Sequence, residues 1–192
     1  MQLGEDTITM SMTLNPVNEA AFQKAVQSLE TLNRAAVFHP TGTGKSCIAW
    51  KVVEAHPQTT FFWLVAGAQR LALRQAELTR YNGGTLPGNV RFCDCEKLAA
   101  ATPEQWVRLG EQKPGCIVLD CYHELSAVCW AQSVQKLLRM CPQAKVLGLG
   151  VPNGAPVCAA AQELFADCIV SHMTVAEAMA AGTMPVPSAY AA

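Results

Sequence analysis

Six short apolar runs alternate along this chain with segments of helical periodicity. The runs span residues 35–39, 61–65, 90–92, 116–120, 146–149 and 168–171. They are rich in apolar and often β-branched residues, as strands covered on both faces are. This alternation predicts an α/β fold with a mostly parallel sheet and helices on both faces. In such sheets, ligands bind at the carboxyl ends of the strands.

Helices are predicted around these strands, over residues 17–33, 45–55, 68–81, 103–109, 125–140, 155–165 and 175–180. Pro103 fits the first position of its helix, with Thr102 before it as the N-cap. The helix over 45–55 begins directly at a glycine-rich turn, and that turn carries the clearest functional motif.

Residues 39–46 read His-Pro-Thr-Gly-Thr-Gly-Lys-Ser and connect a predicted strand to a predicted helix. Such a turn directs backbone N–H groups at one point, beside the positive end of the helix dipole, and so predicts a phosphate site. Gly42 and Gly44 let the backbone approach phosphate oxygens. Lys45 reaches β- and γ-phosphates, and Ser46 offers a hydroxyl to Mg²⁺. The first Gly of the strict phosphate-loop pattern has no counterpart here, and the alternative is a glycine-rich turn with an incidental lysine.

Asp120 ends the predicted strand over 116–120, which brings it to the same edge of the sheet as the glycine-rich turn. Phosphate-loop NTPases hold Mg²⁺ with an acid placed in this way. Taken alone, the residue is better explained as an aspartate that caps a helix or turn. Its pairing with the upstream turn favours the functional interpretation, in which Ser46 and Asp120 are the metal ligands.

Composition argues against several classes of protein. The 192 residues carry a formal net charge of −1 and only 15% are charged, so the chain lacks the basic excess of an electrostatic nucleic-acid binder. Its apolar runs are shorter than the roughly 20 residues that cross a bilayer. Residues 1–10 lack the pattern of a signal peptide, and we expect a cytoplasmic protein. The nine cysteines are expected as reduced core residues, because the Cys93-x-Cys95 pair has no second pair at zinc spacing.

These motifs, in this order, resemble the first RecA-like lobe of superfamily 2 helicases of the DEAD/DEAH-box type. Residues 40–46 resemble their motif I, 61–74 motif Ia, 120–123 the Asp-Glu-x-His of motif II, and 148–152 motif III. Residues 14–18 resemble the upstream segment in which an amide side chain reads adenine, which makes Asn18 the corresponding residue. The resemblance covers residues from about 14 to 187 and ends after the first lobe.

The resemblance implies a RecA-like P-loop NTPase domain with ATP and Mg²⁺ as cofactors. The nucleotide would be held by Asn18, Thr41, Gly42, Thr43, Gly44, Lys45 and Ser46. The catalytic residues would be Lys45, Asp120 and His123, with Mg²⁺ on Ser46 and Asp120. The domain would span residues 14–182, after an N-terminal segment over 1–13. Residues 183–192 would form a C-terminal tail or the start of an inter-lobe linker.

Three departures from the family pattern predict weak or absent hydrolysis. Cys121 stands where the family has the glutamate that activates water, and a thiol does not replace that carboxylate as a general base. Residues 150–152 read Gly-Val-Pro and lack the two hydroxyls of motif III. The third departure is that the resemblance ends after the first lobe, whereas the second lobe of these helicases normally supplies arginine fingers. We therefore expect ATP binding with impaired chemistry, and leave open whether the protein is an enzyme.

Two alternatives remain at this point. The fold is a non-enzymatic interaction scaffold for a protein partner, or the chain is a fragment of a helicase acting on DNA or RNA, whose second lobe acts in trans. Arg70 and Arg74, on the predicted helix over 68–81, are candidates for contact with a nucleic-acid backbone. Arginines on an amphipathic helix are more typical of a solvated face, which is how we interpret them.

Overall fold

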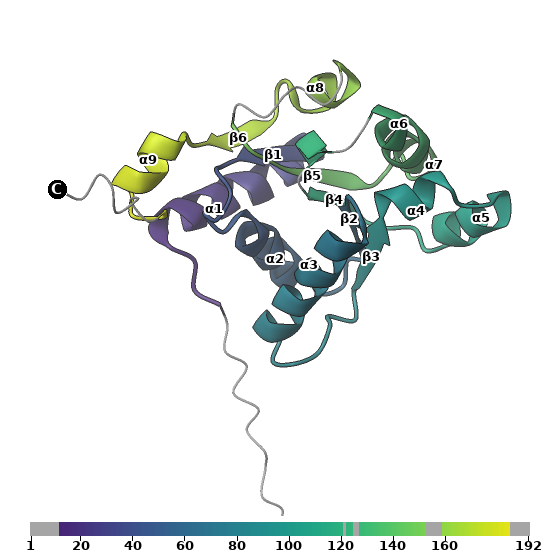
Figure 1. The fold of residues 1–192 in the computed structure, drawn as a ribbon, viewed down its shortest axis with the longest axis horizontal. Helices are drawn as coiled ribbons and strands as arrows, with labels where there is room; N and C mark the ends of the chain where they lie inside the picture. The colour runs from purple at the N-terminus through teal and green to yellow at the C-terminus, as the bar shows by residue number, and fades with distance from the viewer. Residues whose placement is uncertain (1–11, 121, 125–126, 153–158, 185–192) are drawn as a thin grey trace, which may run out of the picture.

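A six-stranded parallel sheet forms the centre of the computed structural model, which describes residues 12–120, 122–124, 127–152 and 159–184 (Figure 1). The strand order is β3-β2-β4-β5-β1-β6. The strands are β1 (Arg34–Phe38), β2 (Phe61–Val65), β3 (Val90–Asp94), β4 (Cys116–Asp120), β5 (Lys145–Gly150) and β6 (Ile169–His172). The predicted α/β fold is confirmed, and each predicted strand is present with its ends displaced by no more than two residues.

Helices cover both faces of this sheet. They are α1 (Pro16–Thr31), α2 (Lys45–Ala55), α3 (Ala68–Tyr81), α4 (Cys95–Ala99), α5 (Pro103–Glu111), α6 (Ala127–Cys129), α7 (Gln135–Met140), α8 (Ala159–Phe165) and α9 (Val175–Ala180). The predicted boundaries of α2, α3 and α9 agree with the structure. Thr102 caps α5 in a capping box with Gln105, as the Thr-Pro sequence predicts.

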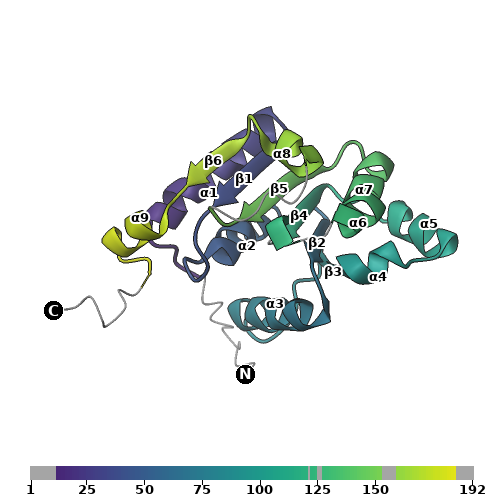
Figure 2. The ribbon, with the colours of Figure 1, turned by 45° about the horizontal axis from the view of Figure 1, so that its top comes forward.

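The pleat of the strands divides the core into two layers. Val37, Trp63 and Val118 belong to a buried cluster with α1, α2 and α3 on one face. Their neighbours in the sequence point the other way and pack against α5, α7 and α8. Figure 2 shows α3 set apart from the strands, over one end of the sheet. The first face therefore has a close cover, α2, and a looser one, α3.

Two regions differ from the sequence-based prediction. The helix predicted over 125–140 is divided, from residue 127 on, into α6, a π turn (Trp130–Val134) and α7. A 3-10 turn (Tyr122–Glu124) precedes it. Within the π turn, the side chain of Ser133 is buried and its hydroxyl donates to the carbonyl of Cys95 at 2.6 Å. Helix α4 was not predicted, although Asp94 caps it by accepting from the amide of Glu96 at 2.9 Å. The part of the helix prediction over 155–158 and the tail over 185–192 lie outside the described residues.

The strand order fixes where a ligand can bind. Strands β1 and β4 are separated by β5, and all three run parallel. The loop after β1 and the last residue of β4 therefore lie at the same, carboxyl edge of the sheet. After β1 the chain leaves this edge through α2 on one face, and after β4 it leaves through helices on the other face. The crevice where the two paths diverge is where α/β sheets bind ligands.

Candidate phosphate-binding site

The glycine-rich turn has the backbone conformation that its sequence predicts. Gly42 and Gly44 have φ of +87° and +86°, in the left-handed region that favours glycine. The hydroxyl of Thr43 donates to the carbonyl of Pro40 at 2.8 Å and closes the loop between them. Gly44 is the N-cap of α2, so the first amides of an eleven-residue helix point to the mouth of the loop. This geometry suits an anion.

Lys45 lies within the loop. Its ammonium donates to the carbonyls of His39 and Pro40, at 2.7 and 2.9 Å, and the residue is buried. The cation is thus held at the position where the loop amides converge. A phosphate that bound here would share the three donors of the ammonium with these carbonyls.

Asn18 supports the loop from α1. Its Nδ2 donates to the carbonyl of Thr43 at 2.7 Å, and a Cβ on Gly44 would lie 2.8 Å from the same nitrogen. The residue is only 3% exposed. Its amide nitrogen therefore holds the backbone of the loop. The reading of adenine by Asn18, which the resemblance implies, stays a prediction.

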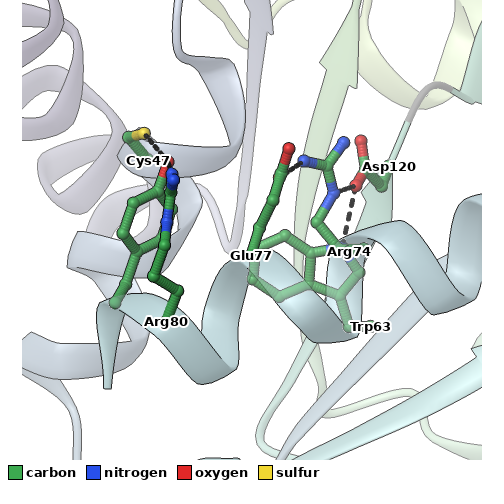
Figure 3. A network of polar contacts seen from close by, with 7 residues as sticks. Cys47, Trp63, Arg74, Glu77, Arg80 and Asp120 are labelled. Carbon is green, nitrogen blue, oxygen red and sulfur yellow. Dashed lines mark hydrogen bonds and ion pairs between the residues drawn. The ribbon is translucent and has the colours of Figure 1, made fainter. Parts of the chain in front are cut away.

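Asp120 faces the α1–α3 side of the sheet and lies in a network of donors (Figure 3). Its Oδ2 accepts from the indole nitrogen of Trp63 at 3.0 Å and from Nε of Arg74 at 2.5 Å. The carboxylate is buried and the Arg74 side chain is one-fifth exposed. Arg74 also forms an ion pair with Glu77, one turn further along α3. A single guanidinium therefore bridges two carboxylates.

This arrangement corrects the interpretation of Arg74 as part of a solvated face. Arg74, Glu77 and Tyr81 occupy positions i, i+3 and i+7 of α3, which is one face of the helix. This face turns toward Asp120 and the loop, although the side chain of Glu77 stays 42% exposed. Arg74 is thereby paired with two carboxylates.

The loop, Asp120 and α3 enclose one pocket of about 360 Å³. Its walls are Thr41, Gly42, Gly44, Lys45, Ser46, Cys47, Arg74, Glu77, Tyr81 and Asp120. Sequence reasoning had placed Lys45, Ser46 and Asp120 together, and the structure brings them to this pocket. The contribution of α3 was missed. The spacing of its Arg, Glu and Tyr is the signal that could have indicated it.

The far wall of the pocket joins α2 to the end of α3. The thiol of Cys47 donates to the hydroxyl of Tyr81 at 3.6 Å. The guanidinium of Arg80 lies 5.1 Å from the centre of the Tyr81 ring, within range of a cation–π contact. Figure 3 shows these contacts beside the network at Asp120. The pocket therefore has an aromatic wall as well as a charged one.

His39, directly before the loop, is a further residue that sequence reasoning did not assign. Its Nε2 lies 2.7 Å from the hydroxyl of Ser171 in β6, and its ring is fully buried. Burial, together with the positive charges of Lys45 and His172, lowers the pKa of His39 to about 4. A neutral ring is thus fixed between the loop and an edge strand.

His123 is half-buried in the 3-10 turn after β4. Burial lowers its pKa, and the positive charges of Lys45 and Arg70 act in the same direction, against the opposing effect of Asp120. The ring is therefore within the electrostatic reach of the pocket. Cys121, at the position of the family's glutamate, lies outside the described residues.

Packing leaves little room for a side chain at Gly148 and Gly150, in the segment that resembles motif III. A Cβ on Gly150 would lie 2.9 Å from the ring of Phe38 and 3.3 Å from that of Tyr122, and one on Gly148 would lie 2.6 Å from Phe165. Phe38 and Tyr122 meet edge to face, with ring centres 5.7 Å apart. The serine that the family usually has at the Gly150 position would collide with this pair.

The site fits phosphate better than it fits Mg²⁺. Loop amides, a buried ammonium and an open space above Gly42, where a Cβ would meet nothing within 4 Å, are suited to phosphate oxygens. The proposed metal ligands are Ser46 and Asp120, but the Asp120 Oδ2 already accepts from two donors, one of them cationic. As these residues lie, any metal on Oδ2 would have to displace these donors, and the roles of Ser46 and Asp120 as metal ligands stay a prediction.

Three further observations concern the cysteines, possible metal ligands and the character of the helices. Cys93 and Cys95 are buried free thiols, and burial raises the pKa of Cys93 to about 12. In the described ranges, no group of three or more His, Cys, Asp or Glu side chains is placed to hold a metal ion. Over the same ranges, none of the helices has the length and apolar character needed to span a membrane.

No protein-family model and no curated protein matches the sequence.

Proposed function

We propose that the pocket between the glycine-rich loop and α3 binds the phosphates of a nucleoside triphosphate, with weak or absent hydrolysis. The observation that carries this proposal is the meeting of three features in one pocket: left-handed glycines at a helix N-terminus, the ammonium of Lys45, and Asp120 at the end of a nearby strand. The resemblance to helicase lobes supports ATP as the nucleotide. It also supports slow turnover, because Cys121 stands at the position of the general base.

Calorimetric titration of the purified chain with ATP tests binding. We expect a dissociation constant below about 1 mM for the unchanged protein and a loss of affinity of about tenfold or more for Lys45→Ala, because the ammonium is the cation at the centre of the loop. Lys24→Ala, on the exposed side of α1, is the matched control and should bind ATP as the unchanged chain does. No heat of binding with ATP or GTP would refute the proposal and leave the scaffold alternative.

A further inference from the structure

The two acids that line the pocket share one of its two cations. Lys45, Arg74, Glu77 and Asp120 are the charged residues among the described lining of the pocket. Both carboxylates contact the guanidinium of Arg74. In Figure 3, this guanidinium lies between the two acids, each of which comes from a different element. Each acid is thus already paired with a cationic side chain of the protein.

A divalent metal on Oδ2 of Asp120 would have to compete with the two donors that already contact this oxygen. Mg²⁺ binds carboxylate oxygens at about 2.1 Å and requires nearly ideal octahedral geometry. Nε of Arg74 lies 2.5 Å from Asp120 Oδ2, and the indole nitrogen of Trp63 lies 3.0 Å from the same atom. A metal on that oxygen would be in contact with a fixed positive charge. Arg74 and Mg²⁺ therefore exclude each other at Oδ2 of Asp120.

Arg74 is also well suited to act in place of the metal. Guanidinium is always charged, and its planar set of donors matches both carboxylate and phosphate oxygens. The side chain is mostly buried and lines the pocket while it contacts Asp120. Its position on α3 is held by the ion pair with Glu77 one turn away. The pocket thus contains a permanent cation opposite the ammonium of Lys45.

We propose that Arg74 takes the place of the divalent cation at Asp120, so that the pocket binds nucleotide phosphates as the metal-free anion. This inference rests on the proposed function, since it concerns the same pocket and the same class of ligand. It specifies the form of the ligand and assigns Arg74 as a binding residue.

The test compares ATP binding by calorimetry with excess MgCl₂ and with EDTA, at matched ionic strength. For the unchanged chain, we expect the two dissociation constants to agree within about twofold, or EDTA to give the tighter binding. Binding that is tighter by about tenfold or more with Mg²⁺ would overturn this inference and leave the proposed function intact. Absence of binding in both buffers would instead refute the proposed function. This comparison needs no variant and does not depend on any substitution being tolerated.

Arg74→Gln tests the residue itself, with Arg108→Gln on the exposed face of α5 as the matched control. The control should behave as the unchanged chain does. In Arg74→Gln, we expect either weak binding in both buffers or binding that now strengthens with Mg²⁺ by about tenfold, because Asp120 becomes available to a metal. Arg74→Lys keeps a cation and should restore metal-independent binding in part. Unchanged, metal-independent binding by Arg74→Gln would overturn the role assigned to Arg74.

Discussion

Nε of Arg74 lies 2.5 Å from Oδ2 of Asp120, and this ion pair joins helix α3 to the end of strand β4. The two residues are 46 positions apart in the sequence. The pair fixes the one wall of the pocket that comes from outside the glycine-rich loop and its helix. Its energetics can be measured without any ligand.

Removing one partner of this pair should destabilise the protein. Arg74→Gln leaves a buried carboxylate without its cation, and we expect a loss of about 3 kcal/mol in the free energy of unfolding. Arg74→Gln combined with Asp120→Asn should lose less than the sum of the single changes, by about 1 kcal/mol or more. Urea unfolding followed by fluorescence measures all three. Strict additivity would mean that the pair is not coupled.

The two glycines of the loop should differ in their tolerance of a side chain. Gly44→Ala meets the left-handed backbone and a contact of 2.8 Å with Nδ2 of Asn18, whereas Gly42→Ala meets the backbone cost alone. That backbone cost is about 1 kcal/mol. We expect Gly44→Ala to lower the melting temperature clearly further than Gly42→Ala does. Equal effects would argue against the close approach of Asn18 to the loop.

Acid should destabilise the fold in part through His39. Its pKa is about 4 in the folded protein and about 6.5 in the unfolded chain, so the unfolded state binds more protons between these values. The neutral ring of His39 therefore makes its full contribution to the free energy of unfolding above about pH 6.5. As the pH falls toward 4, the free energy of unfolding decreases by up to about 3 kcal/mol.

Urea unfolding at pH 7.5 and at pH 5 tests this contribution. His39→Gln should lose less stability between the two pH values than the unchanged chain does, because glutamine does not titrate. A variant that responds to acid as strongly as the unchanged chain would exclude His39 as the source.

Restoring the side chain of motif III should cost stability. Gly150→Ser places a Cβ against the rings of Phe38 and Tyr122, and overpacking of this kind costs about 1–3 kcal/mol. Gly88→Ser is the control, since a Cβ there meets nothing within 4 Å. Thermal unfolding compares the two. A neutral effect at Gly150 would show that the aromatic pair can move aside.

Restoring the acid of motif II should increase turnover if ATP is bound. Cys121→Glu introduces a carboxylate where the family has its general base, and such a group contributes about 10²-fold or more. We expect a rise in phosphate release above that of the unchanged chain, measured with ATP in excess. Val128→Glu, at an exposed position of α6, would control for the added charge. The absence of any rise at Cys121 would argue against the role assigned to that position.

Local patterns were enough to predict most of the elements and the meeting of the loop with Asp120. A strand that enters a Gly-x-Gly-Lys turn and a helix has few other conformations, and parallel strands bring their carboxyl ends to one edge. The predicted boundaries of β2 and β4 agree with those in the structure at both ends. These features depend on neighbours in the sequence or on the direction of the strands alone.

The part of the pocket wall that α3 contributes could not be predicted from local patterns. Its charged and aromatic face has the same period whether it meets water or a pocket, and only the placement of the helix decides between them. That placement depends on contacts with the sheet that are remote in the sequence, such as the ion pair of Arg74 with Asp120. The π turn at Trp130 was missed for a related reason, since a single extra residue in a helix has no local signal.

Leu78 is the one buried residue of α3, a helix whose fourteen residues all lie in the described part of the chain. A segment with so few apolar contacts opens by local unfolding at a lower free energy than the strands beside it. Amide protons of α3 should therefore exchange with solvent sooner than those of β4. A ligand that bridged the loop and the Arg74 side chain would slow this exchange, and the helix would report occupancy of the pocket without any change in the sheet.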